Sequence, residues 1–351
     1  MKKFLLVFSF LLCLNVLQAK VITVNNASNN AQFSSLQAAF DQAGVDDTVY
    51  VHGSPTSYGN ATIRKRIVLI GAGYEPSETQ FQFSTVIGNL DLDSTASGGL
   101  GGVGEPINGT KIYAVLISTL SSNNTAAFPK RNITVERCRI NNQLVVTGSN
   151  WTIVNCLINI LNISNWNNIV VSNNFIYYLG PSNQPSVIFS NNIFLPNNGN
   201  VVWSGTVSYA IFSFNIFLNN SPINTNLNYC TFNSNIIGNV NSLVLVTTLN
   251  NNTGADNFNN TNPLFTKMPT PPPISLTNIF DPAYDFRLSA NSVGKGKGPS
   301  GTDIGIYGGN FPMQGLGGAS TLPQITRMDI SNSVLPKTDK LKVSFKARKV
   351  N

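Results

Sequence analysis

Charge is almost absent from the middle of this chain. Between Ile140 and Ala255 the sequence contains no Asp, Glu, Lys, Arg or His, and the whole chain has one histidine, His52. General acid–base catalysis and metal binding both depend on such side chains. The middle of the chain is therefore nearly excluded from the common forms of catalysis, and we expect the protein to use no metal and no cofactor.

The same stretch repeats a short apolar pattern. Its segments begin at Thr134, Thr152, Val170, Ile188, Ile211 and Thr231. These starts are 18, 18, 18, 23 and 20 residues apart, and a nearly fixed period of this size is typical of a solenoid. Short β-branched and aromatic runs broken by Asn, Ser, Gly and Pro predict strands separated by turns.

One column of the aligned repeat is rich in amides. It contains Cys138, Cys156, Asn174, Asn192, Asn215 and Asn235. Parallel strands stack like residues over like at about 4.8 Å, so we predict an inward ladder in which each Asn side chain hydrogen-bonds the next. Each such bond contributes about 1 kcal/mol. Because Asn tolerates the left-handed backbone of a tight turn, we expect this backbone in the ladder residues themselves.

These columns resemble the rungs of the right-handed parallel β-helix, the fold of the pectate-lyase-like superfamily. Phe33–Gly53 resembles the capping helix and first strand of such proteins. Asn262–Phe265 and Asp285–Gly309, which ends in GTDIGIYGG, resemble the closing rungs of secreted bacterial members. The resemblance implies an all-β fold: a parallel β-helix with an N-terminal capping helix and a C-terminal β segment. It implies no single activity, since the fold carries lyases, hydrolases, adhesins and structural fibres.

The N-terminal residues predict export. The sequence MKK followed by the apolar run Phe4–Leu17 is typical of a signal peptide, which we expect to be cleaved near Ala19. The run is too short for a membrane span, so we expect no transmembrane segment in the mature chain and a secreted or cell-surface bacterial protein. We divide the chain into a signal peptide at 1–19, an N-terminal cap at 20–44, the parallel β-helix at 45–310, a Gly-rich linker at 311–322 and a basic β segment at 323–351.

The net charge of +7 comes from the two ends of the chain. The segment after Leu322 has seven Lys or Arg residues against Asp329 and Asp339, and the body between signal peptide and tail is neutral. A basic tail alone is no nucleic-acid footprint, so we predict no nucleic-acid partner. An extracellular glycan or a cell-surface partner remains open.

Cys138 and Cys156 fall in one column on adjacent rungs, within reach of a disulfide. Either they are bonded, or they are two buried thiols that fill ladder positions, which is the interpretation we favour. Neither has a predicted His or carboxylate neighbour on the charge-free side that would make it a nucleophile.

A catalytic site would have to use charges outside the neutral stretch. A polysaccharide lyase needs a cation that neutralises the uronate and a base, for which Glu136, Arg137 and Arg139 are the candidates. A glycoside hydrolase needs two carboxylates about 5–10 Å apart, and Asp91 and Asp93 share one face of a strand. A charged end of the ladder and a polar outer face explain these groups more simply than catalysis does. We therefore expect a non-catalytic adhesion, glycan-binding or structural protein, with a polysaccharide lyase or glycoside hydrolase as the alternative.

A second apolar column runs beside the inward one. It contains Leu157, Phe175, Ile193, Ile216 and Ile236. Adjacent strand residues face opposite ways, so this stripe points outward and needs a partner or a cover, unless a turn lets both columns point inward. We predict that the alternating tail segment Ile325–Ala347 packs on this stripe.

Overall fold

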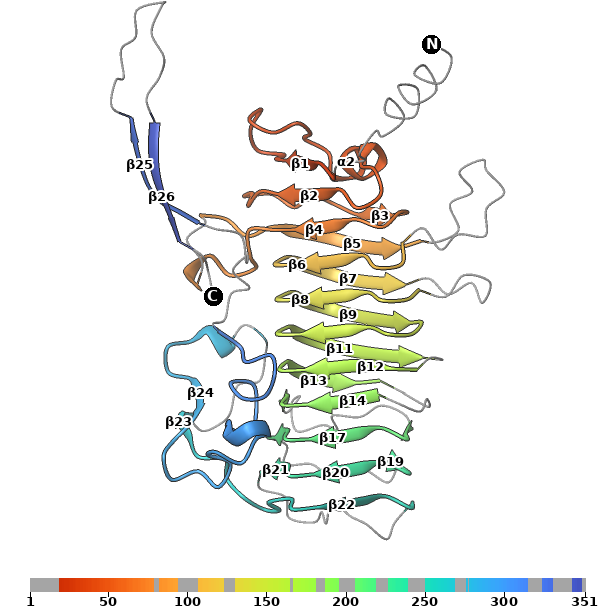
Figure 1. Cartoon of the computed structure of the whole chain (residues 1–351), viewed down its shortest axis with the longest axis vertical. Helices are drawn as coiled ribbons and strands as arrows, with labels where there is room; N and C mark the ends of the chain where they lie inside the picture. The colour runs from red at the N-terminus through yellow and green to blue at the C-terminus, as the bar shows by residue number, and fades with distance from the viewer. Residues whose placement is uncertain are drawn as a thin grey trace, which may run out of the picture.

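The computed structural model is an elongated stack of β-rungs (Figure 1). It describes residues 19–78, 82–93, 107–122, 130–164, 167–180, 187–195, 206–218, 227–238, 250–268, 276 and 278–314, and the backbone of two further strands, Gln324–Ile330 and Val343–Arg348. The predicted signal peptide up to residue 18 and the linker from residue 315 lie outside the described residues. The fold is the expected all-β parallel β-solenoid.

Two large parallel sheets enclose the core of the described chain. The first sheet has 11 strands. In spatial order they are β1 (Val21–Val24), β2 (Thr48–Val51), β4 (Val68–Ile70), β6 (Lys111–Tyr113), β8 (Thr134–Glu136), β10 (Thr152–Val154), β12 (Ile169–Ser172), β14 (Val187–Ser190), β17 (Ile211–Ser213), β20 (Thr231–Asn233) and β22 (Thr253–Ala255).

The second sheet has nine strands and follows the same order along the stack. They are β3 (Ala61–Ile63), β5 (Val86–Leu92), β7 (Leu116–Ser122), β9 (Arg139–Thr147), β11 (Leu157–Ser164), β13 (Phe175–Leu179), β15 (Ile193–Phe194), β18 (Ile216–Phe217) and β21 (Ile236–Ile237). Two short strands, β16 (Val207–Ser208) and β19 (Leu227–Asn228), form a further parallel pair.

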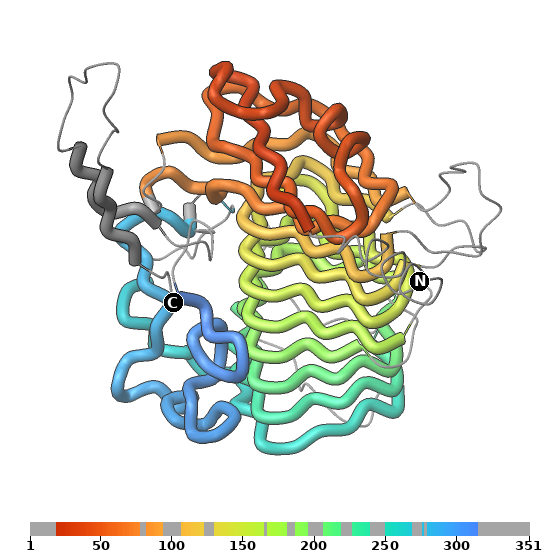
Figure 2. Tube along the Cα trace, turned by 45° about the horizontal axis from the view of Figure 1, so that its top comes forward, coloured from red at the N-terminus to blue at the C-terminus, as the bar shows by residue number. Residues whose placement is uncertain are grey.

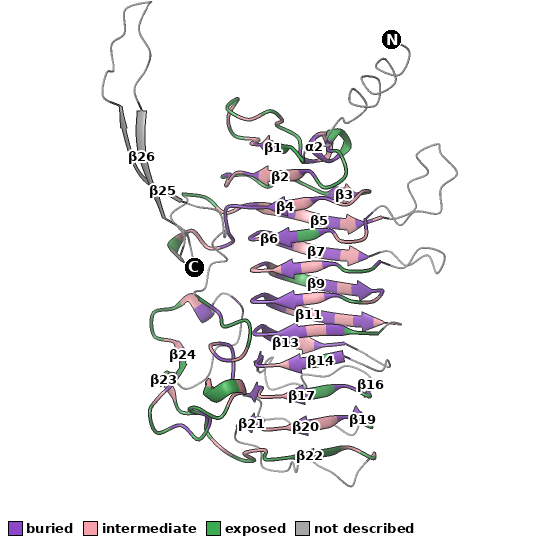
Figure 3. Ribbon diagram, viewed as in Figure 1, coloured by how far each residue is buried: buried purple, intermediate pink, exposed green. Residues whose placement is uncertain are grey.

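The strand register is the one that the sequence columns predict. Thr152 pairs with Thr134 on one side and Val170 on the other, and the sheet continues through Ile188 and Ile211. Buried and partly exposed residues alternate along the strands (Figure 3). Inside the solenoid, like rings stack: Phe189, Phe212 and Phe232 lie nearly parallel with centroids 4.7 and 4.8 Å apart. Dispersion between these rings and burial of their surface stabilise the later rungs.

The asparagine column forms a continuous hydrogen-bonded ladder. The Nδ2 atoms of Asn174, Asn192 and Asn215 each donate to the Oδ1 atom of the next ladder residue at 3.0 Å. That oxygen also accepts the backbone N–H of the preceding ladder residue at 2.9 Å. The ladder ends one rung beyond the predicted column, where Asn235 donates to Asn257. All four predicted asparagines are fully buried, so these bonds satisfy amides that water cannot reach.

The left-handed residues lie one position before the ladder, contrary to our expectation. They are Arg137, Asn155, Asn173, Asn191, Phe214 and Ser234, with φ between 53° and 60°. A ladder side chain must point into the core to reach the neighbouring rungs, so the preceding residue makes the change of direction. The prediction of left-handed backbone in the ladder residues was therefore wrong by one position.

The two ladder cysteines are buried free thiols. Cys156 Sγ accepts the backbone N–H of Cys138 at 3.4 Å, and the N–H of Cys156 donates to Asn174 Oδ1 at 2.8 Å. Sulfur thus replaces the amide oxygen at the start of the ladder. Burial raises the pKa of the Cys156 thiol, which keeps it protonated and unreactive.

A short helix lies at the N-terminal end of the solenoid, next to β1 (Figure 1). Helix α2 spans Leu36–Gln42, and the Ser35 side chain caps it by accepting the Ala38 N–H. Leu36, Ala39 and Phe40 are its buried residues, on the single face that spacings of three and four residues create. This face packs into the core of the first rungs and covers their end.

The second apolar column points outward from the solenoid and is covered by the chain itself. It is buried against a later segment, residues 276–313, which we call the flank segment. Phe286 of this segment meets Phe175 edge to face, with ring centroids 4.8 Å apart. The inner column beginning with Ile158 belongs to the separate core inside the sheets. The alternative in which both columns point inward is therefore wrong.

The flank segment differs from the closing rungs that we expected. The parallel sheets end at β22 and β21, and the later chain folds back along the side of the stack (Figure 2). Strands β23 (Phe265–Lys267) and β24 (Asp285–Leu288) pair antiparallel, outside the two large sheets. Apolar residues of this segment cover the outward stripe more completely than continued stacking would allow, because stacking would leave the stripe in water.

The basic tail contains a strand pair of its own. Strands β25 (Gln324–Ile330) and β26 (Val343–Arg348) form the predicted antiparallel pair. The outward stripe is buried in one cluster with the flank segment, and the packing of the tail on it stays a prediction. The side chains of the tail lie outside the described residues.

Two left-handed asparagines hold the flank segment in place. Asn173 Nδ2 donates to the carbonyls of Ile306 and Gly308 at 2.8 and 2.7 Å, and Asn191 Nδ2 donates to that of Gly305 at 3.2 Å. Gly305 has φ +92°, and a Cβ there would lie 2.7 Å from the Ile216 side chain. The GTDIGIYGG sequence thus fits the corner of the solenoid because its glycines allow this close approach.

Candidate functional site

Glu136 ends β8 on the outer face of the first sheet. Its Oε1 lies 3.4 Å from Arg137 Nε, and its side chain is 24% exposed. Burial raises the pKa of Glu136, and the positive charge of Arg137 opposes that shift. Along the same column Tyr113 precedes it and Val154 follows it. The later rungs add no second carboxylate to this face.

Arg139 begins β9 and lies on the other sheet. The left-handed corner at Arg137 separates the two strands, so Glu136 and Arg139 point away from different sheets. Arg139 Nε donates to Asn141 Oδ1 at 2.8 Å, and its guanidinium carbon lies 5.5 Å from the centroid of the Phe280 ring. Burial lowers the pKa of Arg139. Its contacts belong to the junction with the flank segment, and the expected three-residue cluster is divided.

Asp91 and Asp93 share an outward face near the end of β5, with the buried Leu92 between them, as expected. Each carboxylate has a partner of its own. Ser121 Oγ donates to Asp91, and Arg64 Nε lies 3.7 Å from Asp93 Oδ2. These contacts fit a polar edge of the second sheet held by neighbouring rungs.

The described residues include no group of three or more His, Cys, Asp or Glu side chains that could hold a metal ion. In the same part of the chain, no helix has the length and apolar character needed to cross a membrane.

Exposed apolar and aromatic residues lie together on the outer face of the first sheet, over β14 and β17. Ile188 and Ile211 pair in register there and are 39% and 38% exposed. Tyr209 and Tyr229 lie at the corner that leads into β17 and β20, and are 48% and 51% exposed. We call these four residues the tyrosine patch. It lies wholly within the stretch that has no charged side chain.

The tyrosine pair is ordered by the repeat itself. The two rings stack with centroids 5.1 Å apart and planes 8° from parallel. Both residues have left-handed backbone, at φ 58° and 54°, where earlier rungs place Asn150 and Asn168. A left-handed conformation costs a bulky residue about 1–2 kcal/mol, whereas Asn tolerates it. Two tyrosines therefore occupy strained positions without gaining burial.

Phe214 offers a useful contrast, because it is also left-handed yet packs partly against the flank segment. The tyrosines have no such cover and remain about half exposed. Backbone strain that packing does not offset is found preferentially at functional positions. Our reading of the sequence missed this pair, although the recurrence of Tyr two positions before two successive strands was a visible signal.

Together the patch offers aliphatic surface, aromatic rings and phenolic hydroxyls without ionic groups. Such a surface suits a ligand that is itself uncharged and both apolar and hydroxyl-rich. The neutral stretch that carries the patch contains no Asp, Glu, Lys, Arg or His side chain.

No protein-family model matches this chain, and neither does any curated protein.

Proposed function

We propose that this protein is a secreted or cell-surface β-helix that binds an extracellular glycan through the tyrosine patch without catalysing a reaction. The observation that carries the proposal is the strained, half-exposed stack of Tyr209 and Tyr229 on a face without charge. Sugars present C–H surfaces and many hydroxyls, which aromatic and phenolic groups complement. A neutral glycan avoids the cost of stripping water from an ionised ligand on a surface that offers it no counter-charge.

We further propose that the chain is a bacterial member of the pectate-lyase-like superfamily, exported by a leader that ends at Ala19. The inward asparagine ladder and the helical cap support the membership. The apolar run after MKK supports the leader. Strand β1 begins at Val21, two residues after the proposed end of the leader.

Binding to a panel of neutral and acidic polysaccharides tests the function. We expect the protein to be retained by at least one neutral polysaccharide in affinity electrophoresis. The double variant Tyr209→Ala, Tyr229→Ala should lose at least tenfold in affinity without losing thermal stability. Phe311→Ala is the matched control, because Phe311 is an aromatic residue 42% exposed outside the patch. Equal binding by the double variant, or retention by acidic polysaccharides alone, would contradict the proposal.

A polysaccharide lyase or glycoside hydrolase is the second candidate. One observation favours it: the buried environment raises the pKa of Glu136, and a carboxyl group that holds its proton more firmly is a better general acid. Incubation with the same panel, followed by assays for unsaturated uronides and for new reducing ends, separates the two. Sustained turnover that Glu136→Gln or Asp91→Asn abolishes would establish the enzyme and refute the non-catalytic function.

A further inference from the structure

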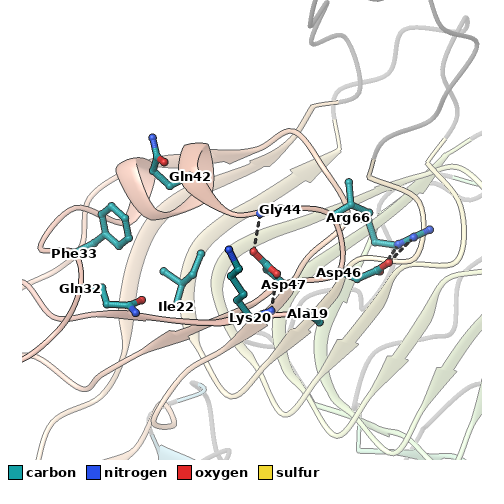
Figure 4. A pocket seen from close by; sticks show the side chains of 11 residues that line it. Ala19, Lys20, Ile22, Gln32, Phe33, Gln42, Gly44, Asp46, Asp47 and Arg66 are labelled. Carbon is teal, nitrogen blue, oxygen red and sulfur yellow. Dashed lines mark hydrogen bonds and ion pairs between the residues drawn. The ribbon is translucent and has the colours of Figure 1, made fainter. Parts of the chain in front are cut away.

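The buried carboxylate of Asp47 accepts two backbone N–H groups next to the start of β1. Asp47 Oδ1 accepts the backbone N–H of Lys20 at 2.7 Å, and its Oδ2 accepts that of Gly44 at the same distance (Figure 4). Asp47 is 6% exposed. Asp47 and Lys20 line a pocket of about 920 Å³ beside the cap, so there is open space next to the Lys20 nitrogen. A carboxylate in such a place needs strong donors to offset its loss of water.

The sheet fixes the position of Lys20 from its other end. Thr48 donates its backbone N–H to the Lys20 carbonyl at 2.8 Å, and Val21 pairs in register with Thr48. The Lys20 nitrogen is therefore placed by the first strand pair and cannot move away from Asp47 without breaking β1. Ala19, by contrast, is exposed. The exposed bond lies between Ala19 and Lys20, where we propose that the leader ends.

We propose that Asp47 is the binding site for the α-ammonium group of Lys20, and that removal of the leader completes the N-terminal cap by creating this group. The inference rests on the leader cleavage proposed above. A processing peptidase and one water molecule break the Ala19–Lys20 peptide bond. The hydroxyl group joins the Ala19 carbonyl carbon, and the proton goes to the Lys20 nitrogen, which takes a second proton from solvent at neutral pH.

The chemical gain comes from a change in the donor. Before cleavage Asp47 accepts a neutral amide N–H, and afterwards the same nitrogen is a cation at the same place. Charge-assisted hydrogen bonds are roughly twice as strong as neutral ones. The burial of Asp47 limits screening by salt and solvent, which weakens ion pairs at the surface.

Two of the other cations around this site are already engaged. Arg66 pairs with Asp46 through its Nε and Nη2 atoms. Lys65 Nζ donates to the carbonyls of Asp41 and Ala43 at the end of α2. The Lys20 side chain lines the same pocket (Figure 4), and among the described ion pairs none joins it to Asp47. The new α-ammonium group is then the cation best placed to meet the buried carboxylate.

The pH dependence has a definite sign. A free α-amine has a pKa of about 8, and a carboxylate partner raises it in the folded protein. The stabilisation is therefore fully present below about pH 8 and is lost as the pH rises through the higher folded value. An extended N-terminus has no amine at this position and lacks this dependence.

Two forms of the protein test the inference. One begins at Lys20, released from a fusion by a protease that leaves no residue, and the other carries Gly-Ser before Lys20. At pH 7 we expect the Lys20 form to melt roughly 2 °C higher. The amide hydrogens of β1 should also exchange severalfold more slowly in that form. Both differences should vanish near pH 10.5. Equal behaviour of the two forms at pH 7, or a difference that persists at pH 10.5, would overturn the inference.

Variants at two adjacent carboxylates supply the control. Asp47→Asn should erase the difference between the two forms, whereas Asp46→Asn, which removes an exposed partner of Arg66, should leave it intact. If Asp47→Asn fails to fold, labelling with an α-amine-selective reagent at pH 7 takes its place. The folded Lys20 form should react at least tenfold more slowly than the same chain in denaturant, and equal rates would refute the site.

The leader is tested separately, by the mass of the protein exported by its own host. A first residue other than Lys20 refutes the proposed cleavage position. The comparison of the two recombinant forms still decides whether Asp47 binds an amine, so the two failures are distinguishable.

Discussion

Replacement of one ladder residue, Asn192→Leu, probes the hydrogen bonds that the solenoid depends on. The Asn192 side chain is fully buried and makes four bonds within 3.0 Å. Its Oδ1 accepts both the backbone N–H and the Nδ2 of Asn174. Its Nδ2 donates to the Val171 carbonyl and to Asn215 Oδ1. Leucine has a similar volume, so the substitution removes these bonds without opening a large cavity.

The expected loss follows from the partners left behind. The backbone N–H of Asn174 loses its acceptor, and a buried orphaned donor costs about 1–3 kcal/mol. Two of the other three partners keep a bond: Asn174 Nδ2 still donates to the Ile153 carbonyl, and Asn215 Oδ1 still accepts the Asn192 N–H. Burial of the leucine methyl groups recovers part of the cost. We expect a net loss of about 1–3 kcal/mol in the free energy of unfolding.

Urea denaturation followed by circular dichroism measures this loss. The matched control is Asn233→Leu, in which an amide two positions before the ladder accepts a single exposed bond from the Ala255 N–H at 3.2 Å. Its free energy of unfolding should change by less than about 0.5 kcal/mol. Equal losses in the two variants, or no loss for Asn192→Leu, would refute the assignment of the ladder as a principal source of stability.

Two further outcomes follow from the flank segment and from Glu136. Phe286→Ala removes a ring that is 2% exposed and lies against Phe175, so the free energy of unfolding should fall by about 3–5 kcal/mol, and a dye that reports apolar surface should bind; unchanged stability without dye binding would show that the stripe needs no cover. Because burial raises the folded pKa of Glu136, its contribution to stability is present below its unfolded value and is lost as the pH rises through the folded one. Thermal melting should therefore show Glu136→Gln gaining stability relative to the wild type between pH 4 and pH 7, and a constant difference would contradict the shift.

Most of the fold could be predicted from the repeat period of the sequence. Parallel stacking forces equivalent residues into register, so the 18-residue steps from Thr134 through Val170 were enough to align the strands and the ladder. The inward column was placed correctly, but the left-handed corner lies one residue earlier, at Asn173 and not at Asn174, because the period aligns equivalent residues without showing where the backbone changes direction.

The candidate site and the flank segment were less accessible from the sequence. Glu136 and Arg139 lie three residues apart, yet the corner between them sends them to different sheets, and no local pattern fixes that corner beforehand. The cover over Phe175 comes from Phe286, whose place depends on how a distant segment folds back. Residues far apart in sequence meet through packing. Composition alone did not show which later segment covers the stripe.

The flank segment also changes how the solenoid must come apart. A plain stack of rungs, each touching only its neighbours, can fray from its free end one rung at a time. Here the side chains of Asn173 and Asn191 donate hydrogen bonds to the flank segment, which also packs in one cluster with Leu157 and Ile236. A rung in this span cannot unfold unless the flank segment detaches, so we expect the later rungs to unfold as one block. During synthesis the flank segment emerges after these rungs, and the block can close only after the rungs beneath it have formed.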